Sequence, residues 1–179
     1  MELVTIRLKL VLITAVLLLA LISDLRTYKI KNSITFSFMA VGITSNAITD
    51  GISGILLSAQ GILLPFVFLV LLYAMRILGA GDIKLFCAVG AIMGAGFALH
   101  AAAYSFICGG VIAAALVLTR KNGADRFKYL FTYMKCCVIS MEVLQYTDFE
   151  DRQDSSKFHF SIAAAAGTIA AAFLNTPIA

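Results

Sequence analysis

Charged residues are scarce in this sequence. They make up 13% of its 179 residues, whereas about a quarter of the residues of an average soluble domain are charged. Hydrophobic residues make up 61%, and the mean hydropathy is +0.95. This composition excludes an ordinary soluble domain. The net charge of +4 therefore calls for an explanation from membrane topology before nucleic-acid binding is considered, and we expect no nucleic-acid partner.

Metal-binding patterns are also missing. The four cysteines form no CxxC motif, and the two histidines, His100 and His159, lie apart from them in the sequence. The spacing typical of zinc sites is therefore absent. We expect the thiols that lie in apolar runs to be small, buried packing residues.

The sequence is rich in apolar runs that are long enough to cross a bilayer. We predict six spans, at residues 4–22, 33–49, 54–77, 83–99, 101–119 and 160–175. The last three are rich in Gly and Ala, which favours close helix packing in membranes. The predicted fold is an all-α membrane protein, a polytopic bundle of about six transmembrane helices that forms a single membrane-embedded domain over residues 1–179.

The positions of Lys and Arg predict the orientation of this bundle. Of the 14 basic residues, 12 lie in or flank the segments that follow the first, third and fifth spans, and only Arg7 and Lys9 lie on the other side. The positive-inside rule then places these three segments in the cytoplasm and both termini outside. A cleaved secretory signal is the alternative for the N-terminus, but the apolar run is long for a signal and no small-residue cleavage site follows.

Residues 120–157, between spans five and six, form the one substantial polar segment. We predict an amphipathic helix on the cytoplasmic membrane surface, followed by an acidic connector, TDFEDRQDSSK. The segment is either an interfacial strut or a lid or docking surface for a substrate. Its apolar residues recur at helical spacing, and they are Phe127, Leu130, Phe131, Met134, Val138, Met141 and Leu144.

Two of the ten acidic residues lie at span ends on the predicted cytoplasmic side. Asp24 ends the first span and Asp82 begins the fourth, and ionisable groups at membrane depth are costly and usually functional. One interpretation is an aspartyl dyad, in which one carboxyl holds a proton and the other activates water. The other is structural, with Asp82 as a helix N-cap and Asp24 paired with Arg26 or Lys29.

Four further residues are candidates for shaping this site. Gly79 and Gly81 leave the backbone beside Asp82 uncovered, which suits close approach of an extended substrate and is more than an N-cap needs. Lys84 either positions substrate or tunes the dyad, or else anchors the helix at the membrane interface. Asn32 either forms a hydrogen bond near the site or caps the second span.

Helix dipoles give an expectation for where the dyad holds its proton. Asp82 lies at the N-terminus of its predicted helix, where the dipole favours negative charge, whereas Asp24 lies near a C-terminus, where it does not. We therefore expect Asp82 to be ionised and Asp24 to carry the shared proton.

The stretch GAGD at residues 79–82, followed by IKL, resembles the GxGD signature of the type IV prepilin peptidases. The end of the first span is similar to the region around that family's first catalytic aspartate, and the short chain resembles the compact members of tight-adherence (Flp-type) pilus systems. The residues that carry this second similarity are Asp24, Leu25, Arg26, Ile30 and Asn32.

This resemblance implies that Asp24 and Asp82 are the catalytic aspartates of a membrane aspartic endopeptidase. Such an enzyme removes the short basic leader of prepilins or pseudopilins at the cytoplasmic face of the cell membrane, just before the hydrophobic N-terminal helix. The partners implied are these substrates and the lipid bilayer. Neither a metal nor an organic cofactor is implied.

Two departures from the family pattern change what we expect. Lys31 stands where members often have proline, which predicts an altered turn with the chemistry kept. Long members also have an N-terminal domain with paired CxxC motifs that is associated with N-methylation, and no CxxC occurs here. We therefore expect peptidase activity without a methyltransferase domain.

Three other functions are compatible with the same residues. Another GxGD-type protease, similar to the archaeal preflagellin peptidases, would use the same dyad on a different leader. A proton-coupled carrier would use both aspartates as relay groups, and it would need polar residues deeper in the bundle. A non-catalytic scaffold for pilus assembly would tolerate replacement of both aspartates.

Overall fold

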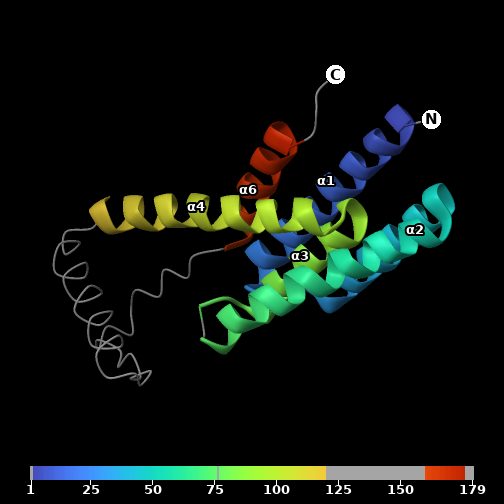
Figure 1. The fold of residues 1–179 in the computed structure, drawn as a ribbon. Helices are drawn as coiled ribbons and strands as arrows, with labels where there is room; N and C mark the ends of the chain where they lie inside the picture. Colours follow the sequence, from blue (N-terminus) through green and yellow to red (C-terminus); the bar gives the residue numbers. More distant parts are fainter. Residues whose placement is uncertain (1, 76, 120–159, 176–179) are drawn as a thin grey trace. The chain divides into compact units, whose positions relative to one another are not determined.

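The computed structural model describes residues 2–75, 77–119 and 160–175, and every element within these ranges is an α-helix (Figure 1). This confirms the predicted all-α class. The amphipathic helix predicted within residues 120–157 lies outside the described residues. The helices, in chain order, are α1 (Glu2–Thr27), α2 (Asn32–Ala74), α3 (Ala80–Met93), α4 (Ala95–Thr119) and α6 (Phe160–Asn175).

The chain divides into two compact units. One consists of Met1–Gly109 with His159–Ala179, and it contains both candidate aspartates; the other is Gly110–Phe158. The described part of the second unit is the C-terminal end of α4. The architecture below is that of the first unit.

Helix α1 has apolar side chains on all sides, but only one stripe is buried. Ile13, Val16 and Ala20 recur at the spacing of one helix face and pack into the core, whereas Leu18 and Leu19 are exposed. Apolar residues on the outer face are unfavourable in water and suit a lipid environment.

Helix α2 consists of two helical arms separated at Gly51. This glycine has φ 60° and ψ −132°, a left-handed conformation that other residues rarely adopt. A straight helix of 43 residues would be about 65 Å long, twice the thickness of a bilayer core. The two arms, residues 32–50 and 52–74, correspond to the predicted spans 33–49 and 54–77.

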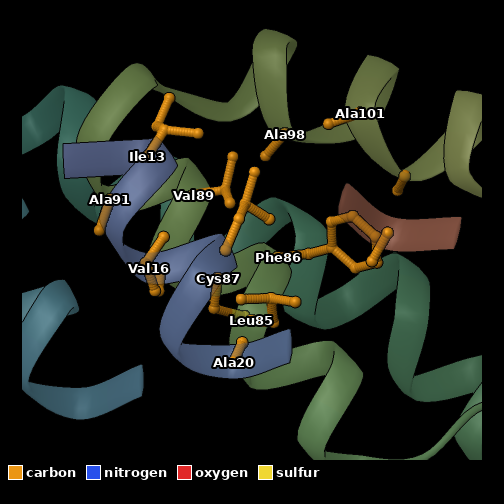
Figure 2. Close-up of a cluster of buried hydrophobic side chains, with 14 of the residues drawn as sticks. Ile13, Val16, Ala20, Leu85, Phe86, Cys87, Val89, Ala91, Ala98 and Ala101 are labelled. Atoms are coloured by element: carbon orange, nitrogen blue, oxygen red, sulfur yellow. The ribbon is translucent and has the colours of Figure 1, made fainter. Parts of the chain in front are cut away.

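Helix α3 is the central element, and both arms of α2 pack against it. Apart from its first turn and its last residue it is buried on almost every side (Figure 2), as is typical of a helix that is hydrophobic all round. Two glycines of α2 allow backbone contact with α3: a Cβ at Gly42 would lie 2.8 Å from the carbonyl carbon of Ala91, and one at Gly61 would collide with Gly90.

The boundary between the fourth and fifth predicted spans, set at residues 99–101, is wrong. Helix α3 ends at Met93, because Gly94 takes φ 94° and breaks the helix. His100, which falls between the two predicted spans, lies inside α4, where its Nδ1 is 2.8 Å from the carbonyl oxygen of Gly96. The intrahelical contact explains how a polar ring is accommodated there.

Three described helices are long and apolar enough to cross a membrane: α1, α2 and α4. Helices α3 and α6 have 14 and 16 residues, fewer than the roughly 20 that a bilayer core requires. Counting α2 as two arms, the described ranges contain six helical segments. The number that span the bilayer remains a prediction.

Candidate active site

The structure brings together the ends of α1 and α3 that bear the two predicted aspartates. Asp24 lies in the last turns of α1 and Asp82 in the first turn of α3, and both side chains are half-buried. The charge of Asp24 is one of the causes that raise the pKa of Asp82. Two residues 58 positions apart in the sequence therefore lie within electrostatic reach of one another.

Asp82 is not the N-cap of α3, so that part of the structural alternative is wrong. The N-cap is Gly79, in extended conformation, and Asp82 is the third residue of the helix. A backbone hydrogen bond from Gly79 reaches the Asp82 carboxylate and lowers its pKa. A carboxylate that reaches back from the third helical residue to the N-cap N–H is half of a capping box.

The two glycines of the GAGD stretch are favoured for different steric reasons. A Cβ at Gly79 would lie 3.0 Å from Oδ2 of Asp82, so glycine leaves room for the carboxylate. A Cβ at Gly81 would lie 3.2 Å from Cβ of Ile30, in the turn between α1 and α2. The predicted close approach to Gly81 therefore occurs within the chain, where Ile30 takes the space that we had expected a substrate to use.

Burial dominates the protonation of Asp82. Its pKa rises from 3.8 to about 6, first because the carboxyl is withdrawn from water and second because Asp24 is negatively charged, against the lowering hydrogen bond from Gly79. A helix dipole contributes only about 0.3–1 kcal/mol, less than a shift of this size represents. The direction that we expected from the dipole, toward the ionised form of Asp82, is therefore wrong, because the pKa of this carboxyl is raised.

Asp24 receives a short hydrogen bond from a residue far along the chain. Oγ of Ser161 donates to Oδ2 of Asp24 at 2.6 Å. Ser161 is the second residue of α6 and is 3% exposed. The end of α1 that bears Asp24 thus packs against α6 as well as against α3.

Ser23 and Thr27 organise the turn that follows Asp24. Oγ of Ser23 donates to the carbonyl of Lys29 at 2.9 Å and accepts from the backbone N–H of Lys31 at 3.3 Å. Oγ1 of Thr27 donates to the carbonyls of Ser23 and Lys29. These bonds fix a tight turn, which places Ile30 against the first turn of α3 and keeps it beside the aspartates.

Lys84 and Asn32 meet, as their candidacy for the same region predicts. Nζ of Lys84 donates to Oδ1 of Asn32 at 2.9 Å, and it lies 5.6 Å from the centre of the Phe36 ring, a cation–π distance. The N-cap of α2 is Lys31, so the alternative that Asn32 is the cap is wrong. These contacts join the starts of α2 and α3.

Ser161 and Ser23 are the site residues that the sequence analysis missed. A hydroxyl near a helix end is usually interpreted as a local cap, and nothing in the sequence links Ser161 to Asp24. Among the described residues, no group of three or more His, Cys, Asp and Glu side chains is arranged to hold a metal ion. The chemistry that the described side chains offer is that of two carboxyls in unlike surroundings.

Comparison with known families agrees with this geometry. A family model described as the type IV leader peptidase family matches residues 11–114, more than half of the chain, and this range includes Asp24, Gly79, Gly81 and Asp82. No curated protein and no solved structure matches the chain. The suspected family is thereby confirmed: the chain belongs to the type IV leader peptidase family, and it is a protease whose long apolar helices indicate a membrane protein.

Proposed function

We propose that this protease is a membrane aspartic endopeptidase that removes the basic leader of prepilins or pseudopilins at the cytoplasmic face of the cell membrane, with Asp24 and Asp82 as its catalytic pair. The observation that carries the proposal is the electrostatic coupling of these two carboxyls in a chain of the type IV leader peptidase family. Carboxyl pairs whose environments separate their proton affinities are suited to acid–base catalysis.

The proposed reaction uses one carboxylate and one carboxylic acid. Asp24 takes a proton from water as the water oxygen attacks the scissile carbonyl carbon, and Asp82 gives its proton to the carbonyl oxygen. The C–N bond then breaks, the leaving amine takes the proton from Asp24, and Asp82 recovers a proton from the hydroxyl. A pKa of about 6 for Asp82 keeps its acid form available near neutral pH.

The proposed substrate fits the distribution of polarity in the chain. A prepilin's hydrophobic helix can lie in the bilayer beside the exposed apolar surfaces of the helices, while its basic leader stays in the cytoplasm. A preflagellin-like leader is the alternative substrate, and only the sequence of the cleaved precursor distinguishes the two.

The carrier alternative is weakened by the contacts of two buried polar residues, Asn46 and Ser58. Nδ2 of Asn46 donates to the carbonyls of Ala91 and Ile92 and to Ser58, and Ser58 donates to Ala91. These side chains bind the last carbonyls of α3, which a helix cannot satisfy by itself. Their role is structural, so they do not extend a proton relay from the aspartates.

The test is co-expression in membranes with candidate prepilins encoded beside the gene, with leader removal followed by mass spectrometry. We expect cleavage by the wild type and none by Asp24→Asn or Asp82→Asn, because either change removes one proton-transfer group. Asp50→Asn is the matched control, since Asp50 is exposed in the turn of α2 and should keep full cleavage. Cleavage that survives Asp24→Asn or Asp82→Asn would remove that residue from the mechanism, and no cleavage of any candidate would favour the scaffold.

A further inference from the structure

We propose that Ser161 is a positioning residue for Asp24: its hydroxyl, delivered by the first turn of α6, holds Asp24 in the dyad as the unprotonated carboxylate that activates water. This inference rests on the proposed function and assigns the roles within it. The motif region at residues 79–85 and the end of α1 would then form only two of the three parts of the site, and α6 would supply the third.

The geometry of the hydrogen bond is the first argument. Oγ of Ser161 and Oδ2 of Asp24 are 2.6 Å apart, a separation typical of hydroxyls that donate to an ionised carboxylate. Ser161 is buried, at 3% exposure, so little water competes for its hydroxyl. A buried hydroxyl that donates to Oδ2 makes that oxygen a poor place for a proton and fixes the direction in which the other carboxylate oxygen points.

Helix directions give the second argument. Asp24 lies near the C-terminus of α1, where the partial negative charge of the helix end is unfavourable for a carboxylate. Ser161 brings the N-terminal end of α6 to the same carboxylate, and that end carries partial positive charge. The contact therefore offsets the unfavourable position of Asp24 on its own helix.

The start of α6 is held in place by packing, which makes the hydroxyl preorganised. The rings of Phe160 and Phe106 lie 5.7 Å apart, and a Cβ at Gly109 would be in ordinary contact with Phe160 and Ala163. Further along α6, a Cβ at Gly167 would collide with Ser105. Close packing of α6 on α4 at these points leaves Ser161 little freedom to move away from Asp24.

Helix α6 has no charged side chain that could replace Ser161 as a donor to Asp24. Residues 160–175 contain no titratable side chain, and the other hydroxyl of this helix, Thr168, donates to the carbonyl of Ala164. Outside α6, the charged residues on the adjoining helix ends are Arg26 on α1, Lys29 and Lys31 in the turn before α2, and Asp82 and Lys84 on α3.

The test compares Ser161→Ala with Ser161→Thr and with a matched control, Ser105→Ala. Ser105 is also buried and also faces α6, but its hydroxyl donates to the carbonyls of Ala101 and Ala164. The probe is a synthetic peptide that contains the leader and hydrophobic segment of a precursor cleaved by the wild type. Readouts are kcat, KM, the pH profile and the melting temperature in detergent.

For Ser161→Ala we expect kcat to fall about 10-fold to 100-fold, the range for loss of a hydrogen bond to a charged group. KM should stay within about twofold, because the binding of the peptide is not altered. The shape of the pH profile should change, because the Asp24 carboxylate loses its donor. Ser161→Thr should restore most of kcat, and Ser105→Ala should leave kcat and the profile unchanged.

A readout without substrate separates this inference from the proposed function. Infrared titration of the Asp24 carboxylate band, assigned by its loss in Asp24→Asn, should show an altered band in Ser161→Ala and a wild-type band in Ser105→Ala. An unchanged Asp24 band, or an unchanged pH profile with full kcat, would overturn the role of Ser161. If the wild type cleaves no precursor, the proposed function fails while the infrared comparison still decides whether Ser161 controls Asp24.

Discussion

At the scale of single residues, Asp82 is subject to opposing demands. The start of α3 uses its carboxylate to bind the backbone of Gly79, which stabilises the helix end, while burial and the charge of Asp24 penalise its ionised form. The proposed mechanism needs a carboxyl that can hold a proton near neutral pH. The same withdrawal from water that destabilises the charge therefore suits the acid role.

Replacing Asp82 should have opposite effects on the activity and on the stability of the protein. The folded-state pKa of Asp82, about 6, exceeds the ordinary 3.8, so its contribution to stability is complete below pH 3.8 and is lost as pH rises through 6. We expect Asp82→Asn, which keeps an acceptor for Gly79, to abolish cleavage yet raise stability at pH 8 by about 2–3 kcal/mol, with little gain at pH 4. Thermal unfolding in detergent at both pH values measures this, with the exposed Asp50→Asn as control.

An equal gain at pH 4 and pH 8 would show that the carboxyl's ionisation is not its cause. A gain shared by Asp50→Asn would show that general charge reduction explains it. Either result would contradict the raised pKa as the origin of the effect.

Residues that stand out in an apolar sequence were the ones that could be predicted. Asp24 and Asp82 could be identified because carboxylates at span ends are rare and costly, and Lys84 with Asn32 because they flank them. Ser161 could not be found, since a serine at a helix start is ordinary and its partnership with Asp24 exists only after α6 packs on α4. The same holds for Ser23, whose bonds depend on the conformation of the following turn.

At the scale of helices, α3 is a short element whose C-terminal end is completed by α2. The carbonyls of Ala91 and Ile92 accept hydrogen bonds from Asn46, and that of Ala91 also accepts one from Ser58. Both donors are fully buried, one on each arm of α2. The hairpin at Gly51 thus brings two polar side chains to one helix end, which fixes the position of α3 within the bundle.

We expect Asn46→Ala to destabilise the protein by about 2–4 kcal/mol, because it removes an amide whose two N–H groups serve three acceptors and leaves buried carbonyls with fewer donors. Ser58→Ala should cost less, since Asn46 still serves the same carbonyls. Thr44→Ala is the control, because Thr44 is exposed on the same arm and its hydroxyl bonds only to its own helix. Thermal unfolding in detergent gives the ranking, and equal losses for Asn46→Ala and Thr44→Ala would refute the capping role.

The helix boundaries show where periodicity is informative and where it is not. The two arms of α2 matched predicted spans because a polar turn separates two apolar runs. The break between α3 and α4 was misplaced, because Gly94, which ends α3, lies inside an apolar run. Hydropathy locates breaks by polarity, whereas this break depends on backbone conformation, and a polar ring inside α4 is satisfied by the carbonyl of Gly96.

At the scale of the whole molecule, the proposed function depends on which side of the membrane the aspartates face. After α1, the chain runs along the first arm of α2, turns at Gly51 and returns along the second arm to α3. The turn before α2 and the start of α3 therefore lie on one side, and Gly51 lies on the other. The Lys and Arg distribution predicts that the aspartates' side is cytoplasmic. A leader that remains in the cytoplasm can reach the site only in this orientation.

Two serines, one at the start of each arm of α2, test this orientation without changing any charge. Ser33 and Ser53 are both exposed, but only residue 53 is predicted to face outward. In a variant whose four cysteines are replaced, Ser53→Cys should therefore react with a membrane-impermeant maleimide on intact cells. Ser33→Cys should react only after the membranes are opened, and equal labelling of both in detergent controls for reactivity. Labelling of Ser33→Cys on intact cells would place the aspartates outside, and cytoplasmic leader cleavage would then be impossible however well the dyad is formed.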